Sequence, residues 1–157
     1  MSRSLLCIFA IAISCSVFSA QAEAQIQVSV EGCFRQQASP HVTCRLSIRN
    51  AGYTDVRTSF NSSSDRRVAG LDDFVSWAWD NLGRQYQIVD ASIGGARVSR
   101  WRLPFTVPAG LQIPGEIVVA NVAPDAKGFA RMSLKFSPKE NVSRGIEAFE
   151  FRNIPLE

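Results

Sequence analysis

Histidine is almost absent from this sequence: one residue, His41, occurs among 157. The chain also has no cluster with metal-ligand spacing and no nucleophile motif. A catalytic triad or zinc site around His41 would need partners from distant segments, so a solvated turn residue beside Pro40 is the simpler interpretation. We therefore expect no cofactor and no enzymatic activity. The alternative is a small extracytoplasmic hydrolase or metal-dependent enzyme whose site escapes recognition by motif.

Long apolar runs and a strong charge of one sign are also lacking. No apolar run reaches the roughly 18 residues of a membrane-spanning helix, so we expect no transmembrane segment. The formal net charge is +3, and no nucleic-acid-binding motif accompanies it, so nucleic acid is not an expected partner. A composition of 46% hydrophobic and 20% charged residues is that of one ordinary globular domain.

The N-terminus carries the pattern of a secretory signal. Arg3 supplies a positive charge, residues 5–13 form a short apolar region, and residues 22–24 (Ala-Glu-Ala) form a small-x-small cleavage site. We predict a signal peptide over residues 1–24. The domain over residues 25–157 would then be secreted or periplasmic.

Two other interpretations of this segment stay open. Residues 12–15 (Ala-Ile-Ser-Cys) are similar to a bacterial lipobox, in which Cys15 would carry a lipid anchor. A buried N-terminal helix is disfavoured because nothing polar lies on its opposite face.

Removal of the signal peptide would leave two cysteines, Cys33 and Cys44, in an oxidising compartment. Apolar and polar residues alternate over residues 26–30 and 42–49, which predicts two half-buried strands. A hairpin centred between residues 38 and 39 places the two cysteines directly opposite each other. We predict a structural disulfide between them, worth about 3 kcal/mol by loop-closure entropy.

The rest of the chain alternates short apolar segments with turn signals. Gly32 is expected to mark a bulge, because Cys33 is out of phase with Val30. Gly94-Gly95 is interpreted as a break in the chain. Further strands are expected near residues 56–60, 74–79, 86–89, 99–105, 116–122, 130–136 and 149–151. Some seven to nine strands without a convincing helix or linker predict one all-β antiparallel β-sandwich.

Four aspartates, Asp65, Asp72, Asp73 and Asp80, could pool oxygens for Ca²⁺ at one end of the sandwich. Their spacing matches no metal loop. Asp80 precedes a glycine at position 83, and aspartate favours such turns by accepting hydrogen bonds from its own backbone. We interpret these residues as turn formers and predict no metal site.

Three tryptophans, Trp77, Trp79 and Trp101, have two interpretations. They could stack sugars on a flat sheet face, or they could pack in the core. Trp77 and Trp79 share a strand face with Val75, and Trp101 alternates with Leu103. Because the apolar face of a strand is normally the core face, we predict that all three point inward.

Arginines cluster once, at Arg97, Arg100 and Arg102. We expect Arg97 to begin a strand on which Arg100 and Arg102 point outward, with Pro104 and Pro108 placing the end of that strand at a sheet edge. The cluster is a candidate anion-binding site, because guanidinium groups match carboxylates and phosphates. Its alternative role is to protect the edge strand from aggregation.

Five short segments occur in a suggestive order: residues 46–52 (LSIRNAG), 80–86 (DNLGRQY), 103–108 (LPFTVP), 114–119 (PGEIVV) and 134–136 (LKF). They resemble the small secreted immunoglobulin-like domains of bacteria. In those domains an Asn-x-Gly ends an early strand, an Asp-x-x-Gly-x-x-Tyr hairpin follows, and a Pro-Gly precedes a strand that recrosses the sandwich. The resemblance implies an immunoglobulin-like fold and transfers no catalytic residue.

The predicted function is that of a non-catalytic binding or structural module of the cell envelope. The expected partner is an anionic envelope polymer or another envelope protein. The ligand itself is not identified by any motif.

Overall fold

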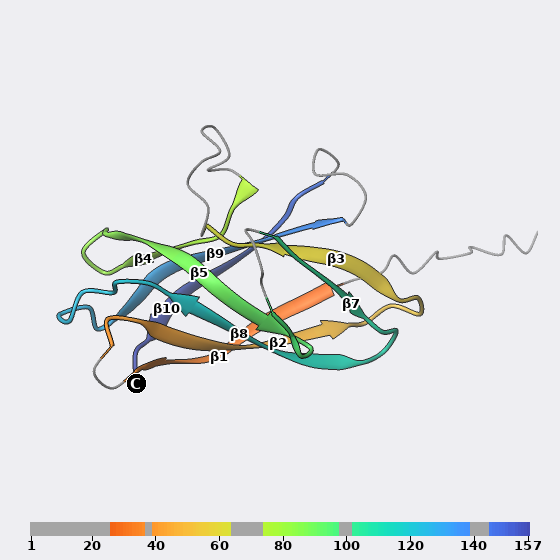
Figure 1. The fold of residues 1–157 in the computed structure, drawn as a ribbon, viewed down its shortest axis with the longest axis horizontal. Helices are drawn as coiled ribbons and strands as arrows, with labels where there is room; N and C mark the ends of the chain where they lie inside the picture. Colours follow the sequence, from red (N-terminus) through yellow and green to blue (C-terminus); the bar gives the residue numbers. More distant parts are fainter. Residues whose placement is uncertain (1–25, 37–38, 64–73, 98–101, 139–144) are drawn as a thin grey trace, which may run out of the picture.

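The computed structural model describes residues 26–36, 39–63, 74–97, 102–138 and 145–157, which form strands in two facing layers (Figure 1). The strands are β1 (Ile26–Arg35), β2 (Val42–Asn50), β3 (Val56–Asn61), β4 (Trp77–Asp80), β5 (Gln85–Ile93), β6 (Ala96–Arg97), β7 (Arg102–Val107), β8 (Gln112–Val119), β9 (Gly128–Pro138) and β10 (Glu147–Pro155).

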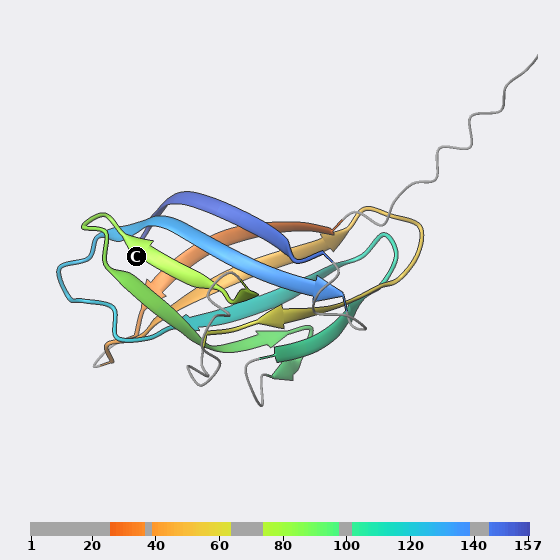
Figure 2. The ribbon, with the colours of Figure 1, turned by 90° about the horizontal axis from the view of Figure 1, so that it is seen from above.

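The strands follow one continuous order, β1-β2-β8-β5-β4-β9-β3-β7, in which β10 also pairs with β9 and β6 with β5. Strand β5 belongs to both layers: Gln85–Gln87 pair with β4, whereas Ile88–Ile93 pair with β8, with a register shift between Ile88 and Asp90. We call β1, β2, β8, β6 and the second part of β5 the first sheet. The second sheet comprises β4, β9, β3, β7, β10 and the first part of β5. Figure 2 shows the same strands from above, after a turn of 90°.

The core lies between the two sheets and follows the predicted alternation. On β2, Val42, Cys44, Leu46 and Ile48 are all at most 1% exposed. The second sheet contributes aromatic residues, among them Phe136, whose ring lies edge-on to neighbouring phenylalanine rings at 5.4 to 6.0 Å between centroids. Edge-to-face packing of this kind adds about 0.5 to 1.5 kcal/mol per pair beyond simple burial.

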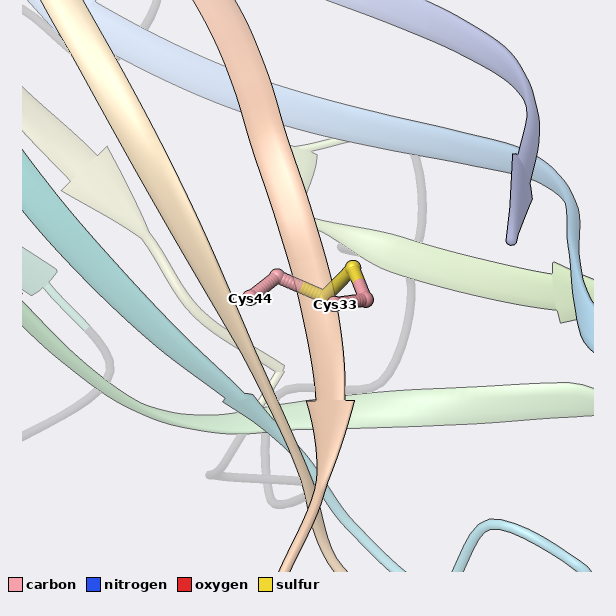
Figure 3. Close-up of a disulfide and its surroundings, with 2 residues drawn as sticks. All are labelled: Cys33 and Cys44. Carbon is pink, nitrogen blue, oxygen red and sulfur yellow. A yellow bond between two sulfur atoms is a disulfide. The ribbon is translucent and has the colours of Figure 1, made fainter. Parts of the chain in front are cut away.

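A disulfide links β1 to β2 (Figure 3). Cys33 lies directly opposite Cys44 in the hairpin, their Cα atoms are 4.0 Å apart, and both residues are fully buried. The bulge expected at Gly32 is present, as the register shifts between Val30 and Gly32. The predicted fold class, an all-β antiparallel β-sandwich with one disulfide, is confirmed.

The described residues form ten strands where seven to nine were expected, and the additional one is β6, which folds back on β5. Gly94 and Gly95 have φ values of 57° and 85°, a left-handed pair that matches the twist of a tight hairpin. The predicted chain break at these glycines is therefore a hairpin turn.

Pro114 and Gly115 lie inside β8, although the sequence suggested that they precede a strand. The Pro114 carbonyl faces β5 and accepts a hydrogen bond from the Gly94 N–H at 2.9 Å, just where β5 has ended. Pro114 therefore lies beside the turn at Gly94, past the end of β5, where its missing N–H interrupts no pairing between the two strands.

The C-terminus closes the sandwich beside β1 (Figure 1). The Glu157 N–H donates to the Cys33 carbonyl at 2.9 Å, and the Arg35 N–H donates to the Glu157 carbonyl at 3.1 Å. The Arg35 guanidinium donates to three loop carbonyls, those of Val122, Ala123 and Ala126. The end of β10, from the second sheet, is thus fixed to the first sheet.

Candidate functional site

Strand β4 directs both of its tryptophans to the outer face of the second sheet. Ala78 is fully buried and Asp80 is 2% exposed, whereas Trp77 and Trp79 are half-buried on the opposite side of the strand. The prediction that these two tryptophans point into the core is wrong. Trp101 lies outside the described residues.

The phase of β4 is set by the turn that follows it. The Asp80 Oδ1 accepts hydrogen bonds from the N–H groups of Leu82 at 2.8 Å and Arg84 at 3.0 Å. Its Oδ2 accepts from the Arg84 Nε at 2.6 Å and from the Tyr86 hydroxyl at 2.7 Å. These bonds hold Asp80 inward, so Ala78 also points inward and the tryptophans point outward.

The same bonds determine the charge of Asp80. Burial alone would raise the pKa of this carboxyl, but the hydrogen bonds from Tyr86, Arg84 and Leu82 outweigh it and lower the pKa to about 2. Asp80 is therefore ionised at neutral pH, and its contacts lie within its own hairpin. If the protein were an enzyme, a cluster of titratable side chains such as Asp80, Arg84 and Tyr86 would be a candidate active site. Here the hydrogen bonds of the cluster close the turn of one hairpin, which gives it a structural role.

No group of three or more metal-ligating side chains occurs in the part of the chain that the structure describes. Of the four aspartates considered from the sequence, Asp80 has the predicted turn role. Asp65, Asp72 and Asp73 lie outside the described residues.

Polar side chains flank the two tryptophans across three neighbouring strands. Trp79 lies between Gln85 on β5 and Arg131 on β9, and Trp77 lies between Gln87 and Ser133 on the same strands. Directly paired residues of antiparallel strands point to the same side of a sheet. We call the resulting surface the tryptophan face; it comprises Trp77, Trp79, Gln85, Gln87, Arg131 and Glu150.

A charged pair supports one end of the tryptophan face. The Arg131 guanidinium lies over the Trp79 ring at 5.0 Å from its centroid. Its Nε donates to the Glu150 Oε2 at 2.7 Å. This hydrogen bond raises the pKa of Arg131 and lowers that of Glu150, so both remain charged. The pair fixes the guanidinium on the indole and leaves charged atoms at the rim.

The arginine cluster is distributed over two strands. Arg97 is exposed on β6, opposite Ser92 in the first sheet, and Arg102 is half-buried at the start of β7, opposite Asn61 in the second sheet. Arg97 and Arg102 were expected on one strand; they lie in β6 and β7, and residues 98–101 between them lie outside the described residues. Arg100 lies outside the described residues.

Strand β7 lies at the end of the sheet order, as its prolines predicted. Pro104 is exposed and pairs with Ser59 of β3. His41 lies half-buried just before β2, where its Nδ1 accepts a hydrogen bond from the Asn121 N–H at 3.4 Å.

The sequence did not single out the polar members of the tryptophan face. Gln85, Gln87, Arg131 and Glu150 come from three strands, and their proximity depends on strand pairing. The sequence feature that could have revealed this face is Asp80. Its side chain accepts hydrogen bonds within the turn and so points inward, which requires Trp77 and Trp79 to point outward.

No protein-family model matches the chain, and no curated protein matches it. A solved structure similar to it is the ASH / PapD-like domain of human CEP192 (PapD-like domain 7), with 15% identity over 100% of this chain and 99% of that chain. The TM-score of 0.39 is too low to support an inference about function or partners. None of the helices in the described residues is long and apolar enough to cross a membrane.

Proposed function

We propose that this protein is an exported, non-catalytic binding module of the cell envelope and that its tryptophan face binds a polysaccharide. The observation that carries the proposal is the outward direction of Trp77 and Trp79. A solvent-facing sheet position normally holds a polar residue, whereas here two neighbouring half-buried indoles lie on the outer face, and apolar surface gathered in this way marks interaction sites.

The chemistry of the tryptophan face suits a sugar chain. The accessible parts of the two half-buried indoles offer a flat apolar surface for the C–H face of a sugar ring. The Arg131 guanidinium covers one face of the Trp79 ring and the Trp77 Nε1 is buried, so hydrogen bonds to sugar hydroxyls would come from the neighbouring polar side chains. The amides of Gln85 and Gln87 provide both donors and acceptors beside the indoles. Arg131 and Glu150 add charged hydrogen-bonding groups at the rim, which suits an anionic envelope polymer.

Export is proposed from the pattern of residues 1–24, and a lipid anchor at Cys15 is its alternative. Envelope polysaccharides are accessible only outside the cytoplasm, so the proposed export would bring the protein to the compartment that contains its proposed ligand. The candidate anion-binding role of Arg97, Arg100 and Arg102 stays a separate prediction.

The test is retention of the purified protein on insoluble peptidoglycan and on a neutral β-linked glucan. The double variant Trp77→Ala/Trp79→Ala should lose at least ten-fold in retention, while its circular dichroism spectrum remains that of a β-sandwich. The matched control is Tyr53→Ala, because Tyr53 is an aromatic residue that is 86% exposed in the turn after β2. Unchanged retention of the double variant, or an equal loss in the control, would contradict the proposal.

A further inference from the structure

A groove of about 300 Å³ lies on the first sheet. Its lining includes Glu31 of β1, Arg45 of β2, Ser92 of β5, and Gly115 and Glu116 of β8. We call it the charged groove. Arg45, Glu116 and Ser92 pair with one another across three strands, so their side chains point to the same face of the sheet.

That face is the outer one, because the residues on either side of Arg45 are core residues. Cys44 is 0% and Leu46 is 1% exposed, whereas the side chains of Arg45 and Glu116 are 62% and 57% exposed. The charged groove and the tryptophan face therefore lie on different sheets of the sandwich.

Small side chains and one bulge create the hollow. Ser92 leaves the middle of the outer face without a large side chain, whereas Gly115 pairs with the core residues Leu46 and Ile93 and lines the groove with its backbone. Glu31 is the extra residue of the bulge, since Val30 pairs with Leu46 and Gly32 with Arg45. The bulge thereby brings Glu31 into the lining of the groove together with Arg45.

Arg45 is held in place by an aromatic ring. Its guanidinium lies over the Phe34 ring at 5.1 Å from the centroid. The Phe34 ring in turn occupies the space beside Gly32, where a Cβ atom would lie 3.0 Å from the Phe34 Cζ. Because this stacking reduces the freedom of the Arg45 side chain, less entropy is lost when the guanidinium binds a ligand.

The charged side chains at the rim of the groove are not saturated by contacts with one another, so they can bind a ligand. The Arg45 Nε and the Glu116 Oε1 are 4.0 Å apart, a loose and exposed pair that contributes little to stability. A simple anion would be attracted by Arg45 but repelled by Glu31 and Glu116. A simple cation would meet the reverse pattern. A molecule with both charges satisfies all three side chains.

We propose that the charged groove binds a small zwitterion of the size of a dipeptide. The ligand ammonium contacts Glu31 and Glu116, and the ligand carboxylate accepts hydrogen bonds from Arg45, whose planar fork matches a carboxylate. A volume of about 300 Å³ is at the lower limit of small-molecule sites and holds on the order of ten water molecules. This binding site is independent of the tryptophan face.

The test is a calorimetric titration of the purified protein with the dipeptide Ala-Ala, with N-acetyl-Ala-Ala and with Ala-Ala amide. Ala-Ala should bind at least ten-fold more tightly than either blocked form. In Arg45→Gln, the preference for Ala-Ala over its amide should disappear. In Glu116→Gln, the preference for Ala-Ala over its N-acetyl form should fall.

Two further variants distinguish a site from general surface charge. Arg49→Gln is the matched control, because Arg49 is an exposed arginine of β2 that pairs with Gln112, away from the groove, and it should leave affinity unchanged. Ser92→Leu fills the groove while every charge is kept, and it should abolish binding. The proposal is wrong if Ala-Ala does not bind, if the blocked dipeptides bind equally well, if Ser92→Leu binds normally, or if Arg49→Gln weakens binding as much as Arg45→Gln.

Discussion

Replacement of Asp80 by Asn tests the turn that orients the tryptophan face. The amide oxygen of Asn can still accept the two backbone hydrogen bonds that Oδ1 accepts from Leu82 and Arg84. The amide nitrogen, however, faces two other donors, the Arg84 Nε and the Tyr86 hydroxyl. With Asp80 only 2% exposed, water cannot replace the lost acceptor.

The expected loss follows from those two contacts. A hydrogen bond to a charged group contributes about 1.5 to 3 kcal/mol, and an unsatisfied buried donor costs about 1 to 3 kcal/mol. Because Arg84 also pairs with Asp125 at 2.9 Å, its guanidinium keeps one partner. We expect Asp80→Asn to lower the free energy of unfolding by about 2 to 4 kcal/mol. Urea denaturation at pH 7, followed by tryptophan fluorescence, measures this loss.

Acid provides a second readout of the same carboxylate. The pKa of Asp80 is lowered from 3.8 to about 2 in the folded protein, so ionised Asp80 stabilises the fold fully above the unfolded pKa of 3.8. That stabilisation is lost as the pH falls through the folded pKa of about 2. The stability difference between the unaltered protein and Asp80→Asn should therefore narrow between about pH 4 and pH 2. A loss below about 1 kcal/mol at pH 7, or a difference that does not change with acid, would refute the reasoning.

Three other predictions concern separate parts of the molecule. Replacing Cys33 and Cys44 together by Ala should lower the free energy of unfolding by about 2 to 4 kcal/mol without changing glycan retention; two free thiols in alkylation and intact-mass analysis of secreted protein would contradict the pairing. Millimolar Ca²⁺ should leave the melting temperature unchanged, and an upward shift that EDTA reverses would show a metal site. Changing Arg100 and Arg102 to Ser should reduce retention on anionic envelope material at low salt; unchanged retention with faster aggregation would assign these arginines to edge protection instead.

The fold was largely predictable from local patterns. Strict alternation from Val42 to Ile48 predicted β2 and its buried face, and the hairpin centre placed Cys33 opposite Cys44. Both inferences use short sequence separations, over which period and turn position determine register. The bulge at Gly32 was predictable for the same reason.

The tryptophan face was not predicted, because the alternation of inward and outward residues was assumed to run unbroken from Val75, which placed Trp77 and Trp79 on the inward side. The chain is not a strand at Ser76, whose hydroxyl donates to the Asn61 carbonyl at 2.6 Å and accepts from the Lys135 N–H at 2.9 Å. Alternation therefore does not continue from Val75 to Trp77. The partners of Asp80 in the folded protein determine the phase instead.

The charged groove could not be predicted from the sequence at all. Glu31, Arg45, Ser92 and Glu116 belong to four strands, and their assembly depends on how β2, β8 and β5 pair. Such long-range pairing is determined by the whole fold and leaves no local pattern.

The most direct test of the central claim is a nuclear magnetic resonance titration that observes the indole N–H signals of the three tryptophans. The ligand is a soluble fragment of envelope polysaccharide, and each signal is assigned with a single Trp→Phe variant. We predict that the signals of Trp77 and Trp79 shift in a saturable manner while that of Trp101 does not. No shift at any fragment concentration, or a shift confined to Trp101, would contradict polysaccharide binding by the tryptophan face.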